Sequence, residues 1–468
     1  MASNDRNPIK CVFPIPPCLS LDSAEDILVV AELAYVWGWA LVNVANRAKR
    51  MRQFADETPL FVEGWPIGYN AFTLQTEHSS PKERLMCCPN TSLLYGGGAF
   101  ALGTKGAISQ VPKELCENDI FWLYSLYDAR TTQFGACGKQ HGSEPGFYLI
   151  VGPHWDGNNP DAERIPEGHI IHCSTDLAFL TARIFLDPSS HIPENIKECL
   201  HKVNFYPAQK YKDGKYQSVD WDSVTNISCP GPTQKKELRY VHPLTFFDEL
   251  PGILDSVKEQ PGEKELYHCV CELLKLAKKD RRVMRICRSV AFETERSTIE
   301  SYMQWSMNGI AAGNGWYTSV DSGQWKPTEY AYRTATAKSN LFQNRPEDTR
   351  YYFTDNDSDK MPLNGKNTYS ITFKDGFPPA KGPWSVTVYN QYHFLFAEPY
   401  SISNRELPSA SVVVHAGPEP PPGDRYFIRT PPNEPFSLYL RAYWMDESSL
   451  STPWNPPEVR KCKVIKAV

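Results

Sequence analysis

At 468 residues, the chain is long enough for about two or three domains and for a large core that needs no disulfide bonds. Its net charge of −5 gives no electrostatic reason to expect nucleic acid as a partner. With 12 Trp, 24 Tyr and 39 Pro, the composition favours a strand-rich protein with long, proline-bounded loops.

The 13 cysteines are scattered and lack the C-x2-C spacing of zinc sites and redox motifs. We therefore expect free thiols in a reducing compartment, and hence a cytoplasmic protein. The N-terminal residues MASNDRNPIK lack the apolar core of a signal peptide.

Residues 1–57 are predicted to form a Pro-rich arm followed by one long helix that ends near residue 54. The helix contains the longest apolar run of the chain, residues 27–44. Glu32 and Asn43 interrupt this run, and both are costly in a bilayer. We therefore expect a buried helix and no membrane span.

Residues 58–240 are predicted to form a first β-domain. In its strand 121–128, alternation places Phe121, Leu123, Ser125 and Tyr127 on one face of the sheet. A Gly-containing loop and a second strand, 146–151, follow. Further on, residues 174–176 resemble a helix cap and predict a short helix that carries Arg183.

Residues 241–325 are predicted to be a helical connector, and residues 326–468 a second β-domain with short strands between Pro and Gly turns. A basic run at 278–288 reads as a solvated helix face. The sequence WLYSLYD at 122–128 returns as WSVTVYN at 384–390, which indicates two β-domains of related construction. The expected fold is therefore α+β and β-rich, with two β-sandwich or jelly-roll-like domains, an N-terminal helix and a helical connector.

A polar trio at the end of the first aromatic strand is the predicted catalytic group. Asp128 can act as a general base, Tyr127 as a hydrogen-bond donor, and Arg130 as a clamp for negative charge. The alternative is a structural Asp–Arg pair that closes a loop.

Four further side chains are predicted to form a substrate-binding rim in the same domain: Asn90, Tyr95, Tyr148 and Arg183. Comparable places in the second half are taken by Tyr389, Asn390, Arg441 and Tyr443. Because Asn390 stands where the first half has Asp128, the second half lacks the base. We therefore expect the chemistry in the first half.

Nucleotide, serine-hydrolase and zinc-protease motifs are missing from the sequence, and we expect neither a cofactor nor a bound metal. His169 and His172 would point to opposite faces of a strand, so they would not meet at one ion. With His141 and His154 nearby in sequence, a jelly-roll metal site remains an alternative.

Taken in order, these motifs resemble a tandem of two domain-of-unknown-function families, 1254 in the N-terminal half and 1214 in the C-terminal half. The first resemblance is carried by Pro89-Asn90…Tyr95, Tyr127-Asp128-Ala129, Arg130-Thr-Thr132, the stretch 146–153 and Arg183. The second is carried by the stretch 313–316, Gly365…Tyr369, Pro383-Trp-Ser385, Tyr389, the stretch 435–444 and Trp454…Pro457. The resemblance implies two β-sandwich or jelly-roll modules joined by helices, and it implies no particular reaction. The family pattern P-N-x-D-T-L-Y has Ser92 and Leu93 here, so chemistry that depends on its acidic residue is in doubt.

Three functions are compatible with these residues. The first is a cofactor-independent enzyme, a hydrolase or a lyase/isomerase, that acts on a small, partly apolar organic metabolite in the first β-domain. The second is a non-catalytic protein that binds carbohydrate or lipid or serves in assembly. The third is a metal-dependent jelly-roll enzyme. The sequence leaves the substrate and the oligomeric state open, a homo-oligomer included.

Overall fold

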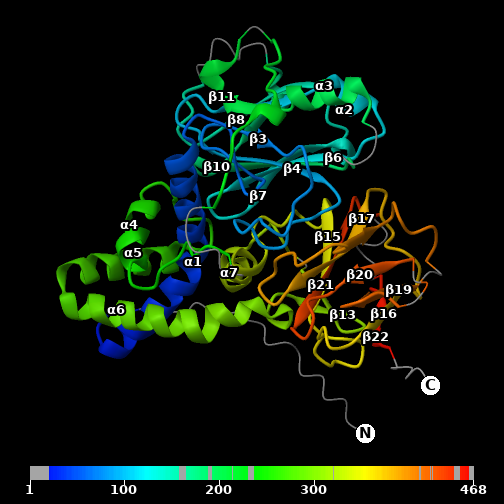
Figure 1. Ribbon diagram of the computed structural model, residues 1–468. Helices are drawn as coiled ribbons and strands as arrows, with labels where there is room; N and C mark the ends of the chain where they lie inside the picture. Colours follow the sequence, from blue (N-terminus) through cyan, green and yellow to red (C-terminus); the bar gives the residue numbers. More distant parts are fainter. Residues whose placement is uncertain are drawn as a thin grey trace.

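The computed structural model describes residues 20–157, 165–187, 192–212, 214–229, 237–319, 321–410, 413–421, 423, 425–446 and 454–462 (Figure 1). The expected Pro-rich arm, residues 1–19, lies outside these ranges. The α-helices are α1 (Ala24–Ala55), α2 (Lys113–Glu117), α3 (Glu194–Lys202), α4 (Phe246–Leu254), α5 (Lys264–Lys279), α6 (Arg281–Thr294) and α7 (Tyr330–Ser339).

Helix α1 is the centre of a helical layer. Ser23 caps it in a reciprocal pair with Asp26, which satisfies backbone donors at the helix start. The helix contacts α4, α5, α6 and α7, which enclose most of its circumference. By length and composition alone it could cross a membrane, but 83% of its apolar window is buried inside the protein. Its burial against other helices explains the apolar run without a bilayer.

The first β-sandwich has two facing sheets. One sheet has the order β3 (Thr73–Leu74), β4 (Leu94–Ala101), β10 (Leu177–Ile184), β6 (Trp122–Asp128) and β7 (Gln133–Gly138). The other has the order β11 (Phe205–Pro207), β5 (Ala107–Val111), β8 (Gly146–Val151) and β9 (Ile170–His172). A small sheet of β12 (Asn226–Ile227), β1 (Leu60–Val62) and β2 (Trp65–Ile67) lies beside them. One apolar core, with Trp122, Tyr124 and Ile150, fills the space between the two large sheets.

The second β-sandwich repeats this plan. Its larger sheet has the order β13 (Ile310–Gly313), β14 (Trp316–Thr318), β15 (Thr349–Thr354), β21 (Phe436–Tyr443), β17 (Trp384–Asn390) and β18 (Ser401–Ser403). Its smaller sheet has the order β20 (Phe427–Arg429), β19 (Val413–Gly417), β16 (Tyr369–Thr372) and β22 (Glu458–Lys461). Trp384, Leu438 and Leu440 contribute to its core.

Strand for strand, the two sandwiches have the same chain order and the same neighbours, if β3 to β11 are matched with β14 to β22. The parallel pair β8–β9 corresponds to the parallel pair β19–β20. In the larger sheets, Asp128 pairs with Ala178 and Asn390 pairs with Phe436, so the repeated sequence occupies equivalent registers. The expected two related β-domains and the mixed α+β class are confirmed.

Two expectations about local structure are wrong. The segment 177–184 is not a helix but β10, a central strand between β4 and β6. Its apolar spacing also fits a helix, and only pairing with two neighbouring strands decides between them. The helical connector ends earlier than expected, because residues 310–318 form the hairpin β13–β14. The second large sheet therefore begins at Ile310, ahead of the expected boundary at residue 326.

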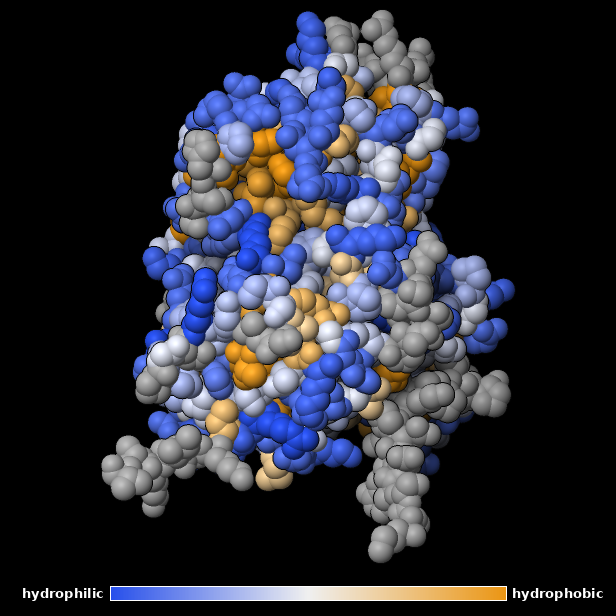
Figure 2. All heavy atoms as spheres, turned by 90° about the vertical axis from the view of Figure 1, so that its right-hand side faces the viewer, coloured by the Kyte–Doolittle hydropathy of each residue, from blue (hydrophilic) through white to orange (hydrophobic). Residues whose placement is uncertain are grey.

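In Figure 1 the first sandwich lies above the second, and α4, α5 and α6 lie to one side of both. The outer face of β10 and the outer face of β21 both turn toward this junction, since their other faces hold the two cores. The face of the molecule shown in Figure 2 is mostly hydrophilic, with apolar patches enclosed by polar side chains. Side chains from both sandwiches can therefore line one buried site at this junction.

Candidate functional site

A cavity of about 60 Å³ lies at the junction of the two sandwiches. The first sandwich contributes Tyr95 and Arg183 to its wall, and the second contributes Tyr351, Arg441 and Tyr443. The rest of the lining is mostly apolar and comes from α1, β2, the loop 86–89, the glycines of β4, β10 and the segment after α7. All lining residues are buried or half-buried. The site therefore belongs to neither half alone.

Arg183 enters the cavity from the outer face of β10. Its Nη1 donates to Ser125 Oγ at 3.0 Å and to Thr181 Oγ1 at 2.8 Å, and its Nη2 donates to the Phe342 carbonyl at 3.3 Å. Only 6% of the residue is exposed. Among the described residues, no carboxylate lies within ion-pair distance of it. Arg183 is thus a buried cation that is held by neutral groups.

Arg441 enters the same cavity from β21. Its Nη1 donates to the Tyr389 hydroxyl at 2.9 Å, and its Nη2 donates to the Cys88 carbonyl. Its guanidinium carbon lies 4.0 Å from the centroid of the Tyr439 ring, a cation–π contact. The residue is 2% exposed, and the described part of the chain offers it no carboxylate partner either.

Two of the other three buried arginines in the described chain pair with a carboxylate, whereas Arg333 has no ion pair and donates to the Trp37 carbonyl at 2.7 Å. Arg47 pairs with Glu237, and Arg130 pairs with Glu263 at 3.0 Å. An unpaired charge in a protein interior costs several kcal/mol. Arg183 and Arg441 differ from Arg333 in that both line one cavity, which concentrates two such charges there.

Sheet register shows that the two arginines are equivalent. Arg183 pairs with Tyr95 on β4, and Arg441 pairs with Tyr351 on β15. The repeated strand sequence ends at Asp128 in the first sandwich and at Asn390 in the second. Their cross-strand partners are Ala178 and Phe436, and each arginine lies five residues after that partner. The cavity is thus enclosed by two copies of one Arg–Tyr arrangement, one from each sandwich.

Three tyrosine hydroxyls of the lining keep a proton to donate. Tyr95 accepts from the Asn90 backbone N–H at 3.1 Å, Tyr443 accepts from Asn90 Nδ2 at 3.1 Å, and Tyr351 accepts from the Asn344 backbone N–H at 2.9 Å. A phenol both donates and accepts, and no acceptor for these three protons is found among the described residues. Burial raises the pKa of Tyr351 and of Tyr443, so both stay protonated at neutral pH. The phenols add neutral donors beside the two cations.

The predicted catalytic Asp128 closes a turn instead of facing the cavity. Its Oδ1 accepts from the backbone N–H groups of Arg130 and Thr132, both at 2.9 Å, and its Oδ2 accepts from Ser174 Oγ at 3.0 Å. Burial raises its pKa, and these hydrogen bonds partly oppose the shift.

The second sandwich contains the same turn, with Asn390 in place of the carboxylate. Asn390 Oδ1 accepts from the N–H groups two and four residues later, at 2.9 and 3.1 Å. Thr131 and His393, each three residues after the capping side chain, have φ values of 65° and 63°. Because an amide fills the equivalent place, the role of Asp128 in the turn does not need an acid.

The other two members of the predicted trio are not among the cavity-lining residues, although the Tyr127 ring contacts the lining residue Phe342. Arg130 is tied to Glu263 and to the Lys258 carbonyl in the helical layer. Tyr127 donates to Asn344 Oδ1, and burial raises its pKa to about 12. The three residues are neighbours in sequence, but their functional groups do not converge on one ligand position. The structural Asp128–Arg130 alternative matches this geometry better.

The predicted binding rim divides into two parts. Tyr95 and Arg183 line the cavity, and Asn90 lies behind it, where it orients the hydroxyls of Tyr95 and Tyr443. Tyr148 lies on β8 in the other sheet, stacked on His169 at 4.1 Å, and its hydroxyl donates to the Glu144 carbonyl. Tyr148 is therefore not part of this site.

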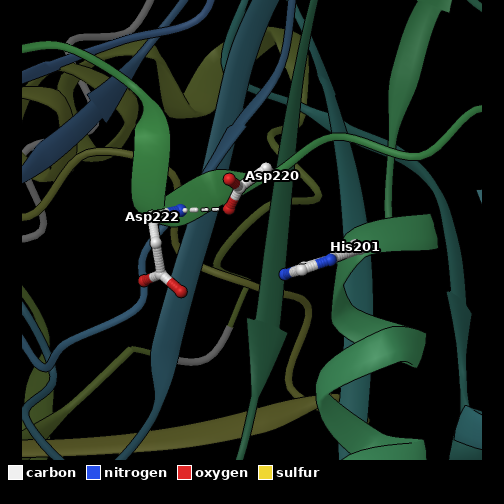
Figure 3. A group of neighbouring side chains, drawn as sticks. All are labelled: His201, Asp220 and Asp222. Carbon is white, nitrogen blue, oxygen red and sulfur yellow. Dashed lines mark hydrogen bonds between the residues drawn. The ribbon is translucent and has the colours of Figure 1, made fainter.

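Among the described residues, the histidines of the alternative metal site do not form a group with metal-ligand geometry. His141 bonds to Asp348 and His169 stacks on Tyr148, and neither joins a cluster of potential ligands. In the described part of the chain, the one group with metal-ligand geometry is His201, Asp220 and Asp222, whose ligand atoms lie within 4.8 Å of one another (Figure 3). Both aspartates are exposed, and Asp220 also caps the following turn through the Asp222 N–H at 3.2 Å. None of these three residues lines the cavity.

Comparisons with known proteins give the two halves their family. A model described as "Protein of unknown function (DUF1254)" matches residues 69–207, and a model described as "Protein of unknown function (DUF1214)" matches residues 348–447. The chain therefore carries a DUF1254 region followed by a DUF1214 region. A search of curated proteins found no match.

Solved structures resemble the DUF1254–DUF1214 chain over most of its length. The crystal structure of the VPA0106 protein from Vibrio parahaemolyticus has a TM-score of 0.60 and 18% identity, and the match covers 93% of this chain and 100% of that one. A Burkholderia cenocepacia protein, titled as uncharacterised, has a TM-score of 0.42 and 11% identity, with 93% and 94% covered. The first of these likenesses shows a shared fold.

The family boundaries show what the sequence alone did not reveal about the site. The DUF1254 domain supplies Tyr95 and Arg183, and the DUF1214 domain supplies Tyr351, Arg441 and Tyr443. The sequence signal for this shared site was present, because Arg441 and Tyr443 were recognised as counterparts of first-half residues. The sequence did not predict that the outer faces of the two large sheets pack against each other.

Proposed function

We propose that the protein is an enzyme, a hydrolase or a lyase/isomerase, that acts on a small, partly apolar organic anion held between its two domains. The observation that carries the proposal is the pair of buried guanidinium groups, Arg183 and Arg441, without a carboxylate partner in the described chain. Their charges, together with phenol donors and an otherwise apolar wall, suit an anion with a carbon skeleton.

The side chains suggest distinct roles in such a reaction. Arg183 and Arg441 would hold the anionic group and stabilise negative charge that develops in the transition state. Tyr443 would donate a proton, since burial keeps its phenol protonated and its hydroxyl already accepts a hydrogen bond from Asn90. A cavity of about 60 Å³ admits only a small molecule or the small end of one, which favours chemistry without a nucleotide cofactor.

A second candidate is a binding protein that holds the same anion without converting it. The observation in its favour is that the lining contains no Asp, Glu or His, the usual general bases. An aromatic binding strip on the surface receives less support, because most aromatic residues in the described chain are buried. The two candidates share the anion site and differ only in turnover.

The anion site is tested with benzoate, a carboxylate with an apolar ring, by isothermal titration calorimetry. We expect wild-type protein to bind benzoate and Arg441→Gln to bind at least about tenfold more weakly, because a charged hydrogen bond contributes about 1.5–3 kcal/mol. Exposed Arg282 provides the matched control, and Arg282→Gln should bind like wild type. Equal benzoate affinity in all three proteins would refute the anion site.

The same variants separate a binding role from a structural role. Without ligand, Arg441→Gln should melt at or above the wild-type temperature, because it removes an unpaired buried charge. Turnover is tested by mass spectrometry of a mixture of small organic acids incubated with wild-type or Tyr443→Phe protein. Loss of product in the variant, with benzoate binding retained, supports the enzyme. A mixture that wild type leaves unchanged supports the binding protein.

A further inference from the structure

The net charge of the cavity lining constrains the charge of its ligand. Arg183 and Arg441 contribute two positive charges, and the lining contributes no negative one. Tyr351 and Tyr443 do not supply it as phenolates at neutral pH, because burial raises the pKa of both. A ligand with one negative charge would therefore leave one buried cation uncompensated.

The arrangement of the two cations is also symmetric. Each arginine projects from the central strand of its own sheet, beside a tyrosine that is its cross-strand partner, Tyr95 or Tyr351. Equivalent groups on two walls of one cavity offer two equivalent places for an oxygen-bearing group. Both arginines line the same small cavity, so one ligand that fills it meets both walls.

The hydrogen-bonding groups match the same kind of ligand. Guanidinium N–H groups and three phenol O–H groups converge as donors, and a carboxylate or phosphate presents only acceptors when ionised. Arg183 uses three hydrogen bonds to neutral protein groups and Arg441 uses two, which leaves N–H groups on each for a ligand. Donors thus exceed protein acceptors on both walls.

We propose that the ligand is a compact dianion that bridges Arg183 and Arg441, with oxygens of one ligand on both guanidinium groups. This inference rests on the proposed anion site and narrows its substrate class. A short dicarboxylate and a phosphate monoester share the required chemistry, namely two negative charges on closely spaced oxygens. Their difference is left to the experiment.

The experiment compares acetate, malonate and inorganic phosphate at pH 8 by isothermal titration calorimetry on the full chain. Acetate carries one charge, and malonate and phosphate carry about two at this pH. We expect malonate, phosphate or both to bind wild type at least about tenfold more tightly than acetate does. Tight binding of malonate but not of phosphate identifies a dicarboxylate site. Tight binding of phosphate but not of malonate identifies a phosphate site.

Variants test the bridging geometry. Arg183→Gln and Arg441→Gln should each reduce dianion affinity at least about tenfold, to a level close to that of acetate, and the two losses should be similar. Arg183→Lys provides a second test if a glutamine variant does not fold, because it keeps the charge and loses the fork-shaped donor. Arg183→Lys should bind the dianion less tightly than wild type does. Its affinity for the dianion should still exceed the affinity of wild type for acetate.

Two results would count against the inference in different ways. Acetate that binds as tightly as both dianions would overturn the dianion proposal and leave the anion site standing. No binding of benzoate, acetate, malonate or phosphate would overturn the anion site itself, and the dianion proposal with it.

Discussion

Replacing Asp128 with asparagine distinguishes a structural turn from a catalytic base. Asn390 already performs the turn function in the second sandwich, with the same pattern of accepted backbone hydrogen bonds. Asp128→Asn keeps the Oδ1 atom that accepts from Arg130 and Thr132, and its new Nδ2 can donate to Ser174 Oγ. We therefore expect a change in unfolding free energy within about 1 kcal/mol.

The alanine variant sets the scale for this comparison. Asp128→Ala leaves two backbone N–H groups and one hydroxyl without their acceptor, and an unsatisfied buried donor costs about 1–3 kcal/mol. Urea denaturation should therefore show Asp128→Ala clearly less stable than wild type and Asp128→Asn close to it.

The pH dependence gives the sign of the electrostatic contribution. The pKa of Asp128 is raised in the folded protein, chiefly by burial, so the folded state binds its proton more tightly than the unfolded state does. This contribution makes wild-type stability fall as pH rises from about 3.9, the unfolded value, through the folded pKa. Asp128→Asn lacks it and should gain stability relative to wild type over that interval. A loss of several kcal/mol in Asp128→Asn at neutral pH, or a loss of turnover with folding intact, would refute the structural role.

Two further predictions concern the fit of the sandwiches. A methyl group at Gly96 would overlap Phe72 in the first core, whereas one at Gly97 would meet its nearest atom, a backbone oxygen, at 3.6 Å. Gly96→Ala should therefore lose about 1–3 kcal/mol of stability and Gly97→Ala less than about 0.5 kcal/mol in urea denaturation; equal losses would contradict the assigned faces of β4. His141 Nε2 lies 2.7 Å from Asp348 Oδ1 across the two domains, and this hydrogen bond raises the pKa of His141. Its stabilisation is full below the unfolded pKa of about 6.5 and is lost as pH rises through the folded value, so His141→Asn should flatten the stability profile above pH about 6.5, and an unchanged slope would contradict it.

Local patterns in the sequence predicted the elements that form within one half of the chain. Alternation along 121–128 assigned the faces of β6 correctly, because one face of that strand is the sandwich core. The repeated strand sequence predicted the second sandwich for the same reason. The α+β class followed from such patterns, and the two families followed from the resemblance of the motifs.

Contacts between distant segments could not be read in this way. Arg183 was expected on a helix because its apolar neighbours fit both periods, and only the pairing of β10 with β4 and β6 makes it a strand residue. The partner of Arg130, Glu263, lies 133 residues away in sequence, so the local pattern could not reveal the ion pair. Arg130 therefore looked free to bind a substrate. The site itself was assigned to one half because the meeting of two outer sheet faces leaves no local signal.

The most direct measurement is a crystal structure of the full chain grown in malonate, refined to a resolution that shows ordered ligand and water. The two-domain anion site predicts malonate density between the sandwiches, within hydrogen-bond distance of both Arg183 and Arg441. Density that is confined to one arginine, or a cavity closed by a carboxylate side chain that pairs with them, would contradict it.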